Sequence, residues 1–568
     1  MRRIFVALAA LLATSCGPPR WETLPELSPA DPPQRGGELN VGTVYVTLSA
    51  LSWDPADWTW KSNHDTGMTR EQLFSADLSR AVSRGGSQHY TLDAYIPPDV
   101  MRGELAESWE WEDPLTLAVR LRRGVMYPER PGFMKARELD AEDVVYTYEY
   151  VSSSPKRINT YFQHIDRVEA RDSHTVVFHF NTYNTEWAYR FGYGYYSSII
   201  PRESKGRDLR DWKNVTGTGP FFLDRYIQGS VQSFSRNPGY WDRDVTPSGE
   251  QSLPYLERVT YRIIKDEATW ITALRTGKLD VLEIMRWSMA KHLMETTPEL
   301  QWNRWLATQG TSIALRTDRP PLDDVRVRRA LNMAINKQEI VDLASEGQAE
   351  LMAFPQHPEF GRYFQPLEEM PESVQELFAY NPDKAKALLK EAGLADGFEL
   401  TVQVCSCNPS HMDLLPLIVD AWSKIGVRAK IQPLEYAAFL SAMTTRTHSE
   451  GYLFEQGHVS PTSTLRKNFE TGQLWNPAMF SDPAFDAKLA RAFATRDEEE
   501  RIRLVRELTI EGMDAAPYIW LPTAYVYTAW WPWVRNYGGE LRAGAVRPGP
   551  IYARVWIDHE LKKKMGFR

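Results

Sequence analysis

The sequence has few cysteines, no surplus of basic residues and no apolar run long enough to cross a membrane. Its 568 residues include three cysteines, too few for a disulfide framework or a four-thiolate zinc site. There are 66 Lys and Arg residues against 74 Asp and Glu residues, a net charge of -8, which argues against a nucleic-acid partner. With 43% apolar residues, the chain is expected to hold its fold by burying a hydrophobic core.

The signatures of common enzymes are also missing. The sequence contains no GxSxG nucleophile elbow, no HExxH pair and no GxxxxGK[ST] phosphate loop. Cys405 and Cys407 lie two residues apart at the end of a predicted strand, and no third ligand follows at zinc spacing. We therefore predict a protein that is not an enzyme and that uses no cofactor and no metal, and the role of the two cysteines stays open.

The amino terminus has the order of an export signal. Arg2 and Arg3 precede an apolar run over 4–13, which is too short to span a bilayer, and then come Thr14, Ser15 and Cys16. The segment 11–16 resembles a bacterial lipobox, in which Cys16 would be lipidated; the alternative is a chance cysteine beside a cleavage site. We predict a signal peptide at 1–15 and a proline-rich tether at 16–35, and hence an exported, periplasmic or cell-surface lipoprotein.

Helices and strands alternate along the rest of the chain, which predicts the α/β class. Helices with clear caps are expected over 141–151, 266–277 and 382–393. A strand over 398–404, a helix over 414–425 and a strand over 427–432 form a strand-helix-strand unit with short joints, typical of a mixed or parallel sheet covered by helices.

Two further patterns have both structural and functional interpretations. Arg326, Arg328 and Arg329 lie on a predicted helix and are interpreted as its solvated face. Aromatic residues are abundant and clustered, and for any single ring core packing competes with a role in a ligand cleft. The clusters are Trp53, Trp58 and Trp60; Tyr193, Tyr195 and Tyr196; and Trp520, Trp530, Trp531 and Trp533.

Eight segments in order carry a resemblance to a known family. They are LAESWE at 105–110, RLRRGV at 120–125, AEDVVY at 141–146, TGTGPF at 216–221, RNPGYW at 236–241, ALRTGKLDV at 273–281, VRRALNMAINK at 327–337 and APYI at 516–519. Together they resemble the family 5 extracellular solute-binding proteins, the oligopeptide, dipeptide and nickel receptors of bacterial ABC importers. The resemblance covers the chain from about residue 36 to the carboxyl terminus.

The resemblance implies a two-lobed periplasmic-binding-protein-like fold of type II-like topology, with an extra domain inserted in the first lobe. The first lobe would comprise 36–70, 185–310 and 501–568, the extra domain 71–184, and the second lobe 311–500. A peptide-like solute would be enclosed by hinge closure and delivered to an ABC permease, with the chain acting as a monomer.

The resemblance also implies ligand-binding residues. Backbone after the first strand, at Tyr45 and Val46, would pair with a peptide. In the loop 452–461, Phe454 takes the place of the family's Trp, and Glu455 is the only acid that could counter a ligand ammonium. Further ligand-binding predictions are Gln456, His458, Trp58, Trp60, Tyr193 and Tyr195. An oligosaccharide or another non-peptide nutrient is the alternative ligand, and an exported hydrolase or chaperone is the remaining alternative function.

Overall fold

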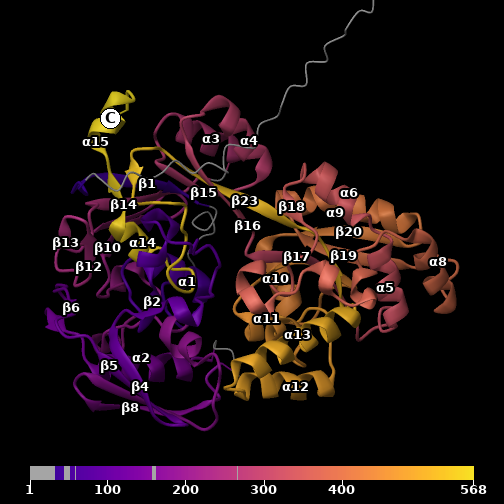
Figure 1. Cartoon of the computed structure of the whole chain (residues 1–568), viewed down its shortest axis with the longest axis horizontal. Helices are drawn as coiled ribbons and strands as arrows, with labels where there is room; N and C mark the ends of the chain where they lie inside the picture. The colour runs from indigo at the N-terminus through magenta and orange to yellow at the C-terminus, as the bar shows by residue number, and fades with distance from the viewer. Residues whose placement is uncertain (1–31, 44–51, 58, 156–160, 265, 568) are drawn as a thin grey trace, which may run out of the picture.

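Two sheets organise the molecule into two lobes, which lie side by side in Figure 1. This computed structural model describes residues 32–43, 52–57, 59–155, 161–264 and 266–567. The predicted α/β class and two-lobed architecture are confirmed, since helices cover a mixed sheet in each lobe.

The first lobe is built on an eight-stranded sheet. Its central strand β1 runs parallel to β14 and β15, and the outer pairings are antiparallel. In spatial order the strands are β10 (Phe221–Ile227), β11 (Val231–Arg236), β14 (Arg258–Arg262), β1 (Glu38–Gly42), β15 (Val281–Met285), β23 (Thr523–Trp530) and β16 (Gln301–Leu306), with β18 (Ala349–Glu350) paired to β23. Its helices are α1 (Thr59–Thr66), α3 (Glu267–Arg275), α4 (Trp287–Thr296), α14 (Gly549–Arg554) and α15 (His559–Lys564).

The second lobe is built on a five-stranded sheet with a hydrophobic cluster on each face. Its order is β20 (Arg428–Leu434), β19 (Glu399–Cys405), β21 (Gly451–Gly457), β17 (Gln309–Leu315) and β22 (Tyr518–Trp520). Its helices are α5 (Val325–Met333), α6 (Lys337–Glu339), α7 (Glu372–Gln375), α8 (Pro382–Glu391), α9 (Pro409–Ser423), α10 (Tyr436–Thr444), α11 (Pro461–Phe469), α12 (Pro483–Ala494) and α13 (Glu498–Asp514).

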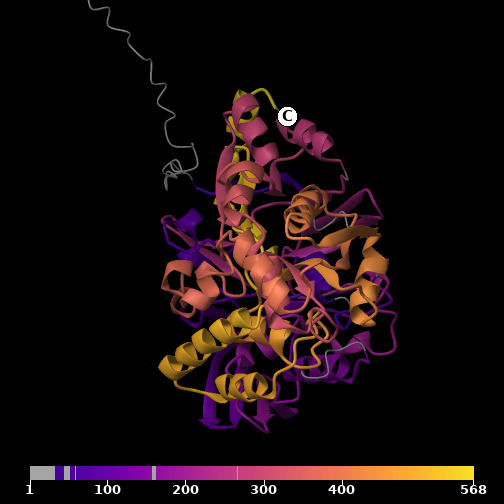
Figure 2. The ribbon, with the colours of Figure 1, turned by 90° about the vertical axis from the view of Figure 1, so that its right-hand side faces the viewer.

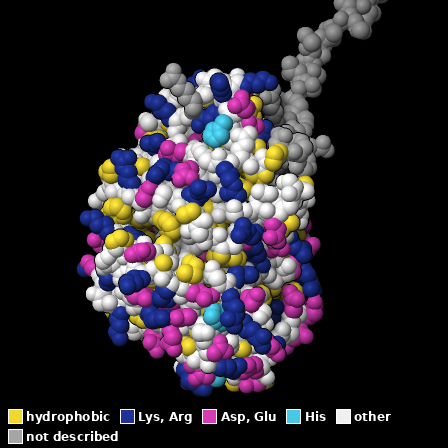
Figure 3. Space-filling model, turned by 90° about the vertical axis from the view of Figure 1, so that its left-hand side faces the viewer, with side chains coloured by type: hydrophobic (Ala, Val, Ile, Leu, Met, Phe, Trp, Pro, Cys, Tyr) yellow, Lys and Arg dark blue, Asp and Glu magenta, His cyan; other side chains and the backbone are white. Residues whose placement is uncertain are grey.

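A separate four-stranded antiparallel sheet lies below the first lobe in Figure 1 and shares its hydrophobic cluster. It consists of β4 (Ala106–Asp113), β5 (Thr116–Leu121), β9 (Thr175–Phe180) and β8 (Ile165–Asp172), with α2 (Ala141–Ser153) packed on it. This sheet falls within the range 71–184 predicted for the extra domain. Charged side chains of both signs are interspersed over the face in Figure 3, so this face offers no surface of one sign.

The remaining strands pair in four short hairpins or bridges. They are β2 (Phe74–Ala76) with β3 (Met101–Gly103), β6 (Met126–Tyr127) with β7 (Arg137–Glu138), β12 (Arg243–Thr246) with β13 (Gly249–Ser252), and β24 (Val534–Arg535) with β25 (Trp556–Ile557).

The chain crosses between the lobes after β16 and again after β22, and between these crossings β18 reaches back to pair with β23 of the first-lobe sheet. The crossings are adjacent, because the Ala307 amide donates to the Ala524 carbonyl at 3.1 Å. The predicted boundary at residue 501 is wrong, since it cuts through α13, which packs on α12 along the lower edge of the second lobe (Figure 2). Strand β22 also pairs with β17, so the second lobe continues to about Trp520.

Local signals in the sequence correctly located several elements. Asp140, Asp266 and Asn381 cap α2, α3 and α8 by accepting backbone N–H groups, and β19 runs parallel to β20 as predicted. The solvated interpretation of Arg328 is wrong. Its guanidinium is buried and donates to the carbonyls of Leu322 and Ala515, so it joins α5 to the end of α13.

Candidate ligand site between the lobes

The loop that follows β21 lies between the lobes. Strand β21 ends at Gly457, opposite Gln309, which is the first residue of β17 after the chain crosses over. The backbone amide of His458 donates to the Thr308 carbonyl at 3.0 Å. Val459 is buried within the hydrophobic cluster of the first lobe. The carboxyl end of this second-lobe strand is therefore inserted into the first lobe.

His458 forms a neutral, aromatic part of this region. Its Nδ1 lies 2.8 Å from the Thr308 carbonyl, which assigns the proton to Nδ1 in the neutral ring. Burial lowers the pKa of His458 to about 4, so the imidazole is uncharged at neutral pH. His357 and Phe360 lie edge-on to it, with ring centroids 5.1 Å and 5.7 Å away, and Tyr95 of the first lobe packs on Phe360.

Four buried side chains, Glu186, Arg190, Ser460 and Ser463, join the lobes in what we call the clasp. The hydroxyls of Ser460 and Ser463 both donate to the Glu186 carboxylate, and the Ser463 amide donates to Glu186 Oε1 at 2.8 Å. Arg190 pairs with Glu186 at 2.9 Å and donates to Ser463 Oγ at 2.8 Å. Because Ser460 is the N-cap of α11, a carboxylate of the first lobe completes the cap of a second-lobe helix.

A second group of charges surrounds Gly457, and we call Asp93, Gly457, Lys467 and Arg542 the Gly457 cluster. Asp93 Oδ1 lies 2.9 Å from Arg542 Nε in an ion pair within the first lobe. Lys467, near the end of α11, donates from Nζ to the Gly457 carbonyl at 3.3 Å. A Cβ on Gly457 would lie 3.9 Å from both Asp93 Oδ2 and Lys467 Nζ. Burial lowers the pKa of Lys467 to about 8, although nearby Asp93 opposes the shift.

The structure separates two of the predicted ligand residues onto opposite faces of β21. Phe454 stacks on Trp475, and Gln456 on the same face donates to the Trp475 carbonyl at 3.1 Å. Glu455 faces the other way, where its Oε1 lies 3.1 Å from His411 Nε2. Burial opposes ionisation of Glu455, but His411 and Asn408 outweigh it and lower the pKa of this carboxyl. A contact between Glu455 and a ligand ammonium stays a prediction, and it would compete with these partners.

The predicted aromatic residues have different environments. Tyr193 is buried in the first-lobe cluster, and its hydroxyl donates to the Ile96 carbonyl at 3.4 Å. Burial and the Asp93 carboxylate raise the pKa of Tyr195, whose ring lies edge-on to Tyr189 at a centroid distance of 6.2 Å. Trp53 is buried edge-on against Tyr226. Tyr45, Val46, Trp58 and Cys16, the predicted lipidation residue, lie outside the described residues, as does the side chain of Trp60.

Five charged residues of the interface were missed by the sequence analysis: Asp93, Glu186, Arg190, Lys467 and Arg542. None belongs to a recognisable motif, and the contacts of Glu186 span more than 270 residues of sequence. One local signal was available, because Ser460 followed by Pro461 is a typical helix start, and it would have placed Lys467 near the end of the same helix.

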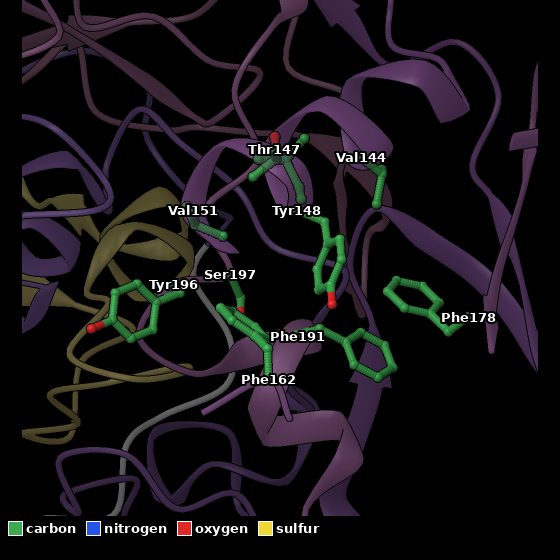
Figure 4. Close-up of a pocket in the computed structure, with 10 residues that line it drawn as sticks. Val144, Thr147, Tyr148, Val151, Phe162, Phe178, Phe191, Tyr196 and Ser197 are labelled. Carbon is green, nitrogen blue, oxygen red and sulfur yellow. The ribbon is translucent and has the colours of Figure 1, made fainter. Parts of the chain in front are cut away.

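Other candidate features lie away from this interface or are too small. Cys405 and Cys407 form a disulfide at the end of β19. A cavity of about 10 Å³ between α2, β9 and Phe191 (Figure 4) has room for about one water molecule. Over the described ranges, no three side chains are grouped to bind a metal ion, and no helix has the length and apolar character to cross a membrane.

The two-lobed fold, with its interlobe interface at the ends of the strands, is the architecture of a solute-binding protein. Residues 100–463, more than half of the chain, match the model of the bacterial extracellular solute-binding proteins, family 5. The chain therefore belongs to this family, as its resemblance predicted.

Relatives and solved structures cover most of the chain. Heme-binding protein A of Haemophilus influenzae is 27% identical over 74% of this chain and 78% of its own length. The dipeptide-binding protein of Escherichia coli strain K12 is 26% identical over 87% of this chain and 94% of its own length. The periplasmic binding protein DppA from Helicobacter pylori, solved in complex with peptide STSA, has a TM-score of 0.74 and 23% identity, covering 92% of this chain and 99% of that one.

Proposed function

We propose that this chain is the substrate-binding subunit of an ABC importer, which captures a peptide-like solute between its lobes and performs no chemistry. The clasp is the observation that carries this proposal. Ser460 and Ser463 contact Glu186 only when the lobes are together, so separation of the lobes removes these bonds and a closed form gains them. A solute that contacts both lobes would add to this gain and shift the population towards the closed form.

Peptide is the favoured class of solute. The dipeptide-binding relative and the peptide-bound structural neighbour support it. The oligosaccharide alternative drew on Trp53, Trp58 and Trp60 and on the neutral loop 454–460. Trp53 is 3% exposed and belongs to the first-lobe core, which leaves this ring no face on which a sugar could stack. Trp58 and the side chain of Trp60 lie outside the described residues.

The proposed setting is the outer face of a cell membrane. The export-like residues 1–15, the lipobox-like Cys16 and the proline-rich residues 16–35 support a lipid-anchored, exported protein. The proposed state of this protein is a monomer. The membrane-embedded partner is a separate permease chain, which receives the solute from the closed form.

Ligand binding by the purified chain tests the proposal. Pools of short peptides and pools of oligosaccharides are compared by thermal shift, and hits are confirmed by calorimetry and small-angle scattering. A peptide at about 100 times its Kd should stabilise the protein by about 2.7 kcal/mol and reduce its radius of gyration as the lobes close. Stabilisation by oligosaccharides alone, or binding without compaction, would contradict the proposal.

A further inference from the structure

Helix α11 has one end in the clasp and the other in the Gly457 cluster. Ser460 and Ser463 at its start are held by Glu186, which fixes the helix against the first lobe. Lys467 lies in its last turn, half-buried, with Nζ 5.5 Å from the centre of the Trp475 ring. The clasp therefore also positions the Lys467 ammonium at the carboxyl end of β21.

Among the described residues, the Gly457 cluster offers Lys467 no ion-pair partner. Asp93 is paired with Arg542 at 2.9 Å, and within the described part of the chain no carboxylate lies within ion-pair distance of Lys467. His458, the next residue along, is neutral. The Lys467 ammonium therefore lacks an ion-pair partner among the described residues. An ammonium withdrawn from water without a counter-ion is costly, and a charge-assisted hydrogen bond to an anion offsets that cost.

The missing side chain at Gly457 leaves a position open to a ligand group. An atom at the place of a Cβ there would have ordinary van der Waals separation, 3.9 Å, from Lys467 Nζ and Asp93 Oδ2. A ligand group that approaches this place meets a cation from the second lobe and an already neutralised acid from the first lobe.

We propose that Lys467 is a specificity-determining residue of the site between the lobes, which selects solutes that present a carboxylate beside Gly457. This inference rests on the proposed function and adds the charge of the group that is recognised. For a peptide, that group is the terminal carboxylate or an acidic side chain.

The competing role for Lys467 is purely structural. A lysine in the last turn of a helix interacts favourably with the helix dipole, typically by about 0.3–1 kcal/mol, whatever the solute. A structural role affects melting and lowers the affinity for all solutes equally, whereas a selective role changes the ratio of affinities between charged and uncharged solutes.

The test compares a tripeptide that binds in the screen, as the free acid, with its C-terminal amide and with an analogue that carries an acidic side chain. Calorimetry is performed on the wild-type protein, Lys467→Met, Lys467→Arg and the matched control Lys386→Met, which changes an exposed lysine of α8. The wild type and Lys386→Met should bind a carboxylate form at least about tenfold more tightly than the form without it. Lys467→Met should remove this preference, and Lys467→Arg should keep part of it.

The other possible outcomes distinguish failure of the role of Lys467 from failure of the proposed function. Equal affinity of the wild type for acid and amide forms, or a preference that survives in Lys467→Met, would overturn the role of Lys467 alone. A parallel loss of affinity for all forms would assign Lys467 a structural role only. Failure of every peptide to bind the wild type would overturn both this inference and the proposed function.

Discussion

The clasp and the Gly457 cluster lie at the two ends of one helix, and they differ in how their charges are matched. In the clasp, one acid meets one guanidinium and two serines, all from within the protein. In the Gly457 cluster, the acceptor that the described residues offer Lys467 is the Gly457 carbonyl, while Asp93 forms an ion pair with Arg542. The clasp, whose charges are paired within the protein, stabilises the closed form without a solute. The Gly457 cluster, in which Lys467 has no ion-pair partner among the described residues, stabilises the closed form only when a bound solute supplies an anion.

The largest effect is expected from Glu186→Ala, which removes the carboxylate of the clasp. It leaves Arg190 buried without its carboxylate and both serines without their acceptor, and removing one partner of a buried ion pair typically costs about 3–5 kcal/mol. Because most of the lost contacts bridge the lobes, solute affinity should fall at least about a hundredfold. Calorimetry and small-angle scattering measure this loss and the expected shift to an open form.

Glu129→Ala is the matched control, since Glu129 is an exposed acid of the same lobe. It should leave affinity and compaction unchanged. Unaltered affinity in Glu186→Ala, with a normal melting profile, would show that the clasp does not contribute to closure.

A rise in pH above about 8 should lower the affinity of the Gly457 cluster for a carboxylate solute. The pKa of Lys467 is lowered to about 8 by burial, and a bound carboxylate would raise it by favouring the ammonium. Binding therefore takes up a proton above about pH 8, and affinity for a carboxylate solute should fall by up to about tenfold per pH unit there. Neighbouring His458, with a pKa of about 4, stays neutral throughout this range. Calorimetry from pH 6 to 9 would reveal the profile, and the same slope in Lys467→Met would assign it to another group.

Ser463→Ala should have a smaller effect, because it removes one member of the clasp and keeps its charges. Its hydroxyl donates to Glu186 and accepts from Arg190, while the backbone amide continues to cap the helix. The expected loss is about 1 kcal/mol, or roughly fivefold in affinity, measured against Ser87→Ala at an exposed serine. A loss as large as that of Glu186→Ala would mean that the hydroxyl, and not the ion pair, dominates the clasp.

Gly457→Ala should have the smallest effect, and it tests whether the gap at Gly457 serves the solute. A Cβ there makes only ordinary contacts at 3.9 Å, so melting should stay the same or rise slightly while solute affinity falls a few-fold. Gly451→Ala, at the other end of β21, is the contrast. Its Cβ would lie 2.9 Å from Val402 Cγ2, so it should lower the melting temperature instead. Thermal shift and calorimetry on both variants separate packing from binding, and unchanged affinity in Gly457→Ala would place the solute elsewhere.

Much of the fold follows from local signals. The caps at Asp140, Asp266 and Asn381 are short-range hydrogen bonds, so sequence alone located them. The predicted domain boundary at residue 501 was wrong because it was taken from the family resemblance. A local signal argued against it, since Asp497 and the three acids after it mark the start of a helix, α13, that continues past residue 501. Arg328 was misjudged because its carbonyl partners at the end of α13 lie far along the chain.

The site was harder to predict than the fold. Sequence analysis singled out the region around β21 as a ligand-binding region, and this stays a prediction. Strand alternation sends Phe454 and Glu455 to opposite faces, and a pattern of residues does not tell which face meets the other lobe. Glu186 and Ser460 come together only through tertiary structure, and neither carries a sequence signal of that pairing.

The paired crossings after β16 and β22, together with the hydrogen bonds of β18 to β23, lie along one border of the interface. The contacts of Arg496 with the Pro114 carbonyl and the Tyr183 ring join α12 to the region of the extra sheet, at the lower border in Figure 1. A rotation about the crossings therefore moves α12 through a longer arc than Gly457. If the lobes close as proposed, a small displacement at the solute becomes a larger one at the rim, within reach of the proposed permease.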